Sequence, residues 1–174
     1  MSISLYQAVI PSYLQIVEAM IGLLDKAEEH CDARGMEHSE LIEAGLAEDM
    51  WPFAKQINSV RHHSIGAIEG MRAGLFQPPV PDVPSDFDGL RQLLSDAKTD
   101  LEALTENEIE AFTGKTVRFQ AGDYKINFIA EDFLLSFSQP NFYFHASTSY
   151  AILRHKGVAI GKGNFLGQFR KIPQ

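Results

Sequence analysis

The sequence predicts an all-α fold, a four-helix bundle with a small β-hairpin between the third and fourth helices. Apolar residues recur every three or four positions through four long stretches, the spacing that places them on one face of a helix. Between the last two stretches, residues 113–128 alternate in polarity around Ala121-Gly122-Asp123, which is typical of a hairpin. A two-stranded ribbon of this size cannot supply a core by itself. We therefore expect residues 1–174 to fold as one helical domain.

The first helix is expected from about Ile3 to His30. Pro11 lies inside it, and because proline removes a backbone hydrogen bond and clashes with the preceding turn, we expect a kink or a broken first turn. Residues 31–48 predict a loop that contains one short helix. The apolar stripe of the first helix consists of Leu5, Val9, Tyr13, Ile16, Met20, Leu23 and Ala27.

Asp49 is the expected N-cap of the second helix, because its carboxylate can accept from free amides of the first turn. Pro52 lies early enough in this helix to be tolerated. The helix is expected to end at Gly74 and the proline-rich run 77–84, since several prolines within eight residues cannot sustain helical hydrogen bonds. Its apolar stripe consists of Phe53, Ile57, Val60, Ile68 and Leu75.

Ser85 is expected to cap the third helix, whose apolar stripe from Phe87 to Leu104 is the most regular in the chain. The fourth helix is expected from about Glu131 to His155 and should end with Gly157 in the left-handed conformation. Pro140 interrupts this helix and predicts a second kink.

The composition excludes several classes of function. A net charge of −8 argues against nucleic-acid binding, because an acidic protein repels the phosphate backbone. Cys31 is the only cysteine, which excludes an internal disulfide or a thiolate zinc cluster and fits a reducing compartment. The N-terminus lacks the features of a secretory signal, and no run approaches the roughly 20 apolar residues of a membrane span. We therefore expect a cytoplasmic protein without a membrane or nucleic-acid partner.

Polar side chains on apolar helix faces mark the candidate site. Asn141 and His145 lie one turn apart on the fourth helix, so both should point toward the bundle interior or a cleft. Burying either one unpaired would cost about 1–3 kcal/mol, so a structural polar network and a ligand site are equally good explanations. On the second helix, Gln56 and His63 lie seven residues apart and face the same side. A polar edge of the core explains His63 better than binding does, and His62 is expected to be solvated.

Four segments carry a resemblance to known proteins. They are DMWPFAKQI (49–57), PNFYFH (140–145), YAILRHKGV (150–158) and IGKGNFLG (160–167). With them, essentially the whole chain resembles the DinB-like superfamily of four-helix bundles, and within it a bacterial family of domains of unknown function. The resemblance implies the same bundle fold.

Many DinB-like proteins bind a divalent metal with three histidines, one on the second helix and an HxxxH pair on the last, and some of them transfer thiols. The pair falls here on Asn141 and His145, and the second-helix ligand falls near Gln56. Two of the three implied ligands are therefore amides, whose oxygens are weaker donors than imidazole for zinc or nickel. Our first hypothesis is thus a degenerate, metal-free polar cleft at Gln56, His63, Asn141 and His145, without a cofactor, that binds a small ligand or is retained as structure.

Two alternatives stay open. The chain could instead be a divalent-metal-dependent enzyme of the thiol-transferase type, with zinc or nickel held by His145, His63 and a carboxylate such as Glu131 or Asp132. A third hypothesis is a homodimeric interaction module without catalysis. In that case the aromatic-rich tail, residues 165–169, would dock on its own chain or on a neighbour.

Overall fold

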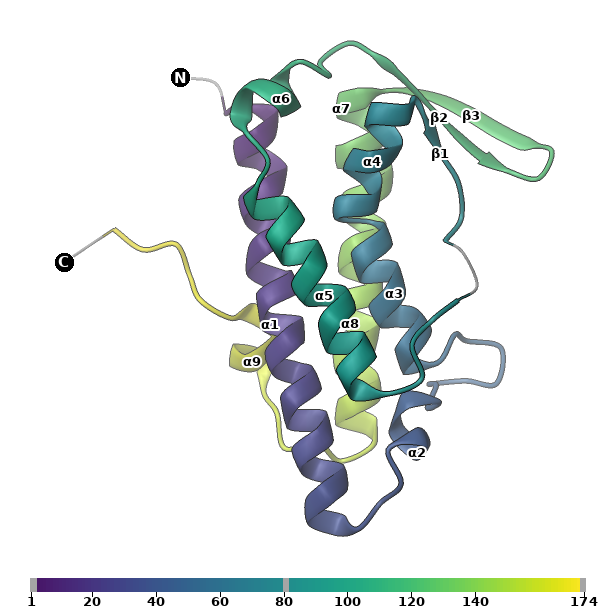
Figure 1. The fold of residues 1–174 in the computed structure, drawn as a ribbon, viewed down its shortest axis with the longest axis vertical. Helices are drawn as coiled ribbons and strands as arrows, with labels where there is room; N and C mark the ends of the chain where they lie inside the picture. Colours follow the sequence, from purple (N-terminus) through teal and green to yellow (C-terminus); the bar gives the residue numbers. More distant parts are fainter. Residues whose placement is uncertain (1–2, 80–81, 173–174) are drawn as a thin grey trace.

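In the computed structural model the chain is mostly helical, with a small three-stranded sheet at one end (Figure 1). The structure describes residues 3–79 and 82–172; residues 80 and 81, part of the expected proline-rich connector, lie outside them. The helices are α1 (Leu5–Arg34), α2 (Ser39–Ile42), α3 (Phe53–His62), α4 (Ile65–Ala73), α5 (Phe87–Glu102), α6 (Glu106–Glu110), α7 (Ala130–Asp132), the π-helix η1 (Phe133–Ser138), α8 (Gln139–His155) and α9 (Lys162–Leu166). The strands are β1 (Leu75–Phe76), β2 (Thr116–Ala121) and β3 (Tyr124–Ile129).

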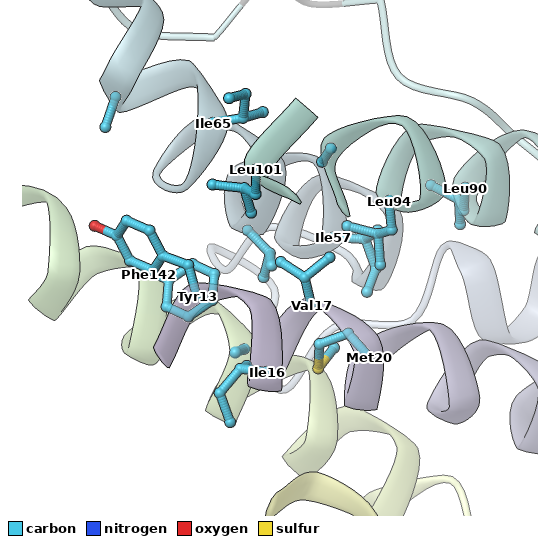
Figure 2. Close-up of a cluster of buried hydrophobic side chains, with 14 of the residues drawn as sticks. Tyr13, Ile16, Val17, Met20, Ile57, Ile65, Leu90, Leu94, Leu101 and Phe142 are labelled. Atoms are coloured by element: carbon cyan, nitrogen blue, oxygen red, sulfur yellow. The ribbon is translucent and has the colours of Figure 1, made fainter. Parts of the chain in front are cut away.

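The long helices run side by side, with α1 packed on α5, α3 packed on both α8 and α5, and the sheet above α4 (Figure 1). Their apolar faces form one buried core, as the periodicity predicted. Tyr13 from α1 lies against Phe142 from α8, with ring centroids 4.6 Å apart. Figure 2 shows the side chains that meet between the helices, among them Val17, Met20, Ile57, Leu90 and Leu94.

Helix α1 is helical from its first turn onward. The Ser4 hydroxyl caps it by accepting from the Gln7 amide at 3.2 Å, and the helix continues through Pro11, so the first turn is not broken. By length and composition α1 could cross a membrane, because its most apolar 18 residues have a mean hydropathy of 1.3. The sequence interpretation overlooked this stretch. Half of that window is buried inside the fold, as in the core helices of globular proteins.

The expected second helix is divided into α3 and α4. The break lies at His63 and Ser64, where Ser64 leaves the helical region with φ −106° and ψ −96°. The Ser64 hydroxyl donates to the Val60 and Arg61 carbonyls at 2.8 and 3.1 Å. These carbonyls lie next to the break, where the regular pattern of helical hydrogen bonds is interrupted. The break fixes where the His63 side chain points.

The two expected N-caps were wrong by a few residues. Helix α3 begins after Pro52 and not after Asp49, because the Phe53 amide already donates to the Ala44 carbonyl at 2.8 Å in the preceding loop. Helix α5 is capped by Asp86 and not by Ser85; its carboxylate accepts from the Gly89 amide at 2.7 Å.

The expected hairpin forms from β2 and β3, which pair in antiparallel register with Thr116 opposite Ile129. A third strand, β1, pairs in parallel with β2 and places Phe76 beside Phe119. This strand has only two residues, so the sequence carried no periodic signal for it. It connects the hairpin to the end of α4 and brings two aromatic rings together beside α8.

A π-helical segment, η1, precedes α8 where a kink at Pro140 was expected. Proline has no amide hydrogen, so the ordinary helical pattern cannot continue unchanged through this position. Pro140 falls in the first turn of α8, directly after the π turns, and π-helical segments are frequent at functional sites. Phe137 from η1 and Asn141 from α8 both border the cavity described below.

The first part of the aromatic-rich tail, Phe165 to Gly167, docks on its own chain, whereas Phe169 is 57% exposed. The Gln15 side-chain amide on α1 donates to the Leu166 carbonyl at 2.8 Å, and Phe165 on α9 lies 5.8 Å from Tyr150 on α8, measured between ring centroids. Gly167 adopts a left-handed φ of 62°, where a Cβ atom would approach Ala19 Cβ to 3.1 Å. A glycine is needed there for the tail to lie close to α1.

Candidate functional site

A cavity of about 470 Å³ lies between α3, α8, η1 and the sheet. All four residues of the predicted cleft line it: Gln56, His63, Asn141 and His145. The structure therefore brings together side chains that are up to 89 positions apart in the sequence. Its walls are otherwise largely aromatic, with rings from Trp51, Phe76, Phe119, Phe137 and Phe144.

A hydrogen bond between Gln56 and His145 joins α3 to α8 inside the cavity wall. His145 Nδ1 lies 2.7 Å from Gln56 Oε1, and Gln56 Nε2 donates to the Trp51 carbonyl at 3.0 Å. Because a carbonyl can only accept, this second bond assigns nitrogen and oxygen within the Gln56 amide. Oε1 is then an acceptor, so His145 Nδ1 carries the hydrogen. The neutral imidazole keeps its lone pair on Nε2, in a residue that lines the cavity.

His145 lies between two other rings. The Trp51 indole is inclined by 12° to the imidazole at a centroid distance of 5.9 Å, and the His63 ring by 15° at 5.7 Å. Burial lowers the pKa of His145 to about 4, because the imidazolium would lose its hydration. At neutral pH His145 is therefore an uncharged hydrogen-bond acceptor held by its neighbours in one orientation.

His63 occupies the break between α3 and α4 and is 8% exposed. Its Nδ1 atom is buried without a hydrogen-bond partner among the described residues. Burial, followed by the nearby His62 and His145, lowers the pKa of His63 to about 3. The backbone here is anchored to η1, since the Ser138 hydroxyl donates to the His63 carbonyl at 2.8 Å. The Nδ1 atom itself is covered by the fold, so His63 contributes a neutral ring to the cavity wall.

Asn141 uses its amide nitrogen within its own helix. Nδ2 donates to the Phe137 carbonyl at 2.7 Å, which directs the side chain along the η1–α8 junction. The side-chain oxygen is left as an acceptor in a half-buried residue that lines the cavity. Asn141 and His145 thus both present an acceptor on the cavity side of α8.

The prediction that His62 is solvated was wrong. The residue is half-buried and lines the cavity, with its ring 4.3 Å from the Phe76 centroid and inclined by 26°. Burial lowers the pKa of His62 to about 4. The cause is β1, which places Phe76 over the end of α3 and covers a position that an uninterrupted helix would expose.

The carboxylates suggested as metal ligands lie elsewhere. Glu131 accepts from the Gly114 amide at 2.9 Å, and neither Glu131 nor Asp132 lines the cavity. Within residues 3–79 and 82–172, no group of three or more His, Cys, Asp or Glu side chains is placed to hold a metal ion. His62, His63 and His145 line the same cavity, but in the described part of the chain they are not placed to share one metal ion.

Sequence reasoning missed Trp51, Phe76 and Phe119 as cavity residues. Trp51 carried a weak signal, because it is the only tryptophan and directly precedes Pro52 at the start of the second helix. Phe76 and Phe119 carried none, since each enters the site through the parallel pairing of β1 with β2. That pairing joins segments more than 40 positions apart.

These features define a mostly helical protein whose long helices enclose, at the sheet end, a cavity with aromatic walls and an oriented neutral histidine. The chain belongs to the family described as Domain of unknown function (DUF1993), whose model matches residues 5–166. Among curated proteins none matches the chain.

A solved structure is similar over nearly the whole length. It is the crystal structure of a DinB family member protein from Shewanella denitrificans, with 22% sequence identity and a TM-score of 0.82. The match covers 98% of this chain and 96% of that one. At this identity the likeness shows the fold alone. The resemblance to a family of unknown function is confirmed, and the chain shares the fold of a DinB family member.

Proposed function

We propose that this chain, as a DinB-like four-helix bundle, is a small-molecule-binding protein whose ligand occupies the cavity without a resident metal. One observation carries the proposal. The Gln56 amide, fixed by the Trp51 carbonyl, orients His145 so that its Nε2 lone pair is available in the cavity. A hydrogen bond to the far nitrogen of an imidazole holds a functional histidine in one tautomer. If His145 only filled space in the core, a free acceptor atom beside a cavity of about 470 Å³ would not add to the stability of the fold.

The chemistry of the walls agrees with a ligand site. A small number of fixed polar groups among aromatic side chains is the usual composition of a small-molecule pocket. Here the fixed groups are His145, His63 and Asn141, and two of them are more than nine-tenths buried. Burial keeps both histidines uncharged at neutral pH, so a ligand would meet acceptors and rings without a positive charge.

A screen of small fragments by saturation-transfer NMR tests this proposal. Fragments that bind the wild type should bind His145→Ala at least about tenfold more weakly, which corresponds to one lost hydrogen bond to a buried acceptor. His155→Ala is the matched control, because His155 lies on the same helix and is exposed. Equal binding to both variants, or no hit from a broad library, would refute the proposal.

The metal-dependent alternative is tested separately by elemental mass spectrometry of untagged protein, followed by calorimetric titration with zinc and nickel. The proposal expects neither metal to bind tightly, since the three lining histidines are not arranged to share one ion and their other polar neighbours are amides. Stoichiometric binding that is lost in His145→Ala would replace the metal-free proposal. It would also justify a screen for thiol transfer.

Self-association is the alternative without a ligand. Leu135 from η1 and Phe144 from α8 are exposed apolar side chains at 44% and 57%, and Phe144 also borders the cavity. Light scattering across a range of protein concentrations separates monomer from dimer. A dimer that dissociates in Phe144→Ser would favour the interaction module over the binding protein.

A further inference from the structure

The charge of the cavity wall restricts what can bind. Among the described residues that line the cavity, Asp49 is the only one with a formal charge at neutral pH, and it lies exposed at the rim. The three lining histidines are neutral, because burial lowers each pKa to about 3 or 4. An anion would therefore lose hydration without meeting a positive side chain. A cation would meet a carboxylate and no like charge.

The hydrogen-bonding capacity of the wall points the same way. His145 Nε2 is a lone-pair acceptor, and Asn141 has committed an amide hydrogen to the Phe137 carbonyl and keeps its oxygen. The hydroxyl of Ser59 is also committed, since it donates to the Lys55 carbonyl at 2.9 Å. His145 Nε2 and Asn141 Oδ1 are thus two acceptors open to a ligand, beside the second hydrogen of the Asn141 amide. A ligand that carries N–H groups can satisfy both acceptors, whereas a ligand that carries only acceptors leaves them unpaired.

The aromatic rings complete the pattern. Trp51, Phe137 and Phe144 border the same cavity as the acceptors, and an ammonium group is attracted to the negative face of such rings. The net charge of −8 also raises the local concentration of cations around the whole molecule.

From these observations we propose that the cavity takes a protonated organic amine with an apolar or aromatic body. Its ammonium N–H groups donate to His145 and Asn141, its charge is balanced by Asp49, and its body lies among the rings. This assignment rests on the proposed function and names the ligand class of the same site.

A neighbouring groove makes an anionic probe necessary in the test. This groove, of about 190 Å³, shares Trp51, Ser59 and Pro79 with the cavity and adds Lys55. A carboxylate could bind there through Lys55, so the experiment must separate the two positions.

Three probes of similar size and different charge decide the assignment: benzylamine, benzyl alcohol and benzoate, each titrated at pH 7.5 by ligand-observed NMR. Benzylamine should bind about tenfold more tightly than benzyl alcohol, the difference expected for one desolvated cation–π contact with a carboxylate nearby. Benzoate should be the weakest of the three. Asp49→Asn should reduce the preference for the amine several-fold, while Asp123→Asn, in the exposed hairpin turn, should leave it unchanged.

The other outcomes overturn the amine assignment in distinguishable ways. If benzyl alcohol binds as tightly as benzylamine and needs His145, the cavity is a ligand site for neutral molecules. Tightest binding by benzoate that is lost in Lys55→Ala would assign the neighbouring groove to an anion. If none of the three binds, the amine assignment is wrong, and the fragment screen decides the proposed function independently.

Discussion

Replacing Gln56 with leucine isolates the hydrogen bonds that orient His145. The side chain is 2% exposed and makes two bonds, one to the Trp51 carbonyl and one to His145 Nδ1. Leucine nearly preserves the volume, so packing changes little, but a buried imidazole N–H is left unpaired at a cost of about 1–3 kcal/mol. With the lost bonds partly offset by the apolar side chain, we expect the free energy of unfolding to fall by about 2 kcal/mol. This corresponds to a decrease of roughly 4–8 °C in Tm for a chain of this size.

Urea unfolding followed by circular dichroism measures the loss, with Gln7→Leu on the exposed face of α1 as the matched control. Long-range proton–nitrogen NMR correlations report the tautomer of His145 in the same samples. The wild type should show hydrogen on Nδ1, and Gln56→Leu should release this preference. A wild-type imidazole with hydrogen on Nε2, or a variant as stable as the control, would refute the assignment of the free lone pair.

Acidification should destabilise the protein before its carboxylates titrate, because burial lowers the pKa values of the cavity histidines to about 3 or 4 while the unfolded chain takes up protons near pH 6.5. The full stabilisation from the neutral histidines is present above pH 6.5. It declines as the pH falls toward 4, by at most about 1.4 kcal/mol per pH unit for each histidine. Between pH 7.5 and 5, the free energy of unfolding measured with urea should therefore fall less in His63→Phe than in the wild type. Gly70→Ala should cost about 1–3 kcal/mol and weaken ligand binding, because the new Cβ would meet Phe76 Cδ2 at 2.8 Å. Gly22→Ala, with nothing within 4 Å, should stabilise by about 0.5–1 kcal/mol, and equal effects of the two changes on stability would contradict this reading of the cavity wall. Trp51 is the only tryptophan and borders the cavity, so its emission should change as a probe saturates the site; unchanged emission would place binding elsewhere.

The helices could be predicted from sequence because each long helix buries one stripe of apolar residues. The break at Ser64 could not, since Phe53, Val60 and Ile68 keep the helical period across it. The break coincides with a hydroxyl–carbonyl bond of Ser64, and neither feature leaves a mark on the pattern of hydrophobicity.

The candidate site was predictable in part for a related reason. Gln56 and His145 are polar side chains beside apolar helix faces, so a buried polar group was expected at each, because leaving such groups unsatisfied is costly. Their bond to each other is seen only in the structure. The aromatic wall depends on the pairing of β1 with β2, which no local pattern encodes. His62 was misplaced for the same reason, because its cover comes from a distant strand.

The π-helical turn before Pro140 sets the phase between two walls of the cavity. One wall is carried by α8, while the hairpin enters through α7 on the other side of η1. Each residue advances a helix by about 100°. Deleting a single residue between 133 and 138 would therefore rotate the preceding segment, α7 and the attached hairpin, by that angle relative to α8. The helices of such a deletion variant could still pack, but Phe119 on the hairpin would no longer share a cavity with His145. Relatives with this fold whose π-helical turn is one residue shorter or longer are therefore expected to bind different ligands.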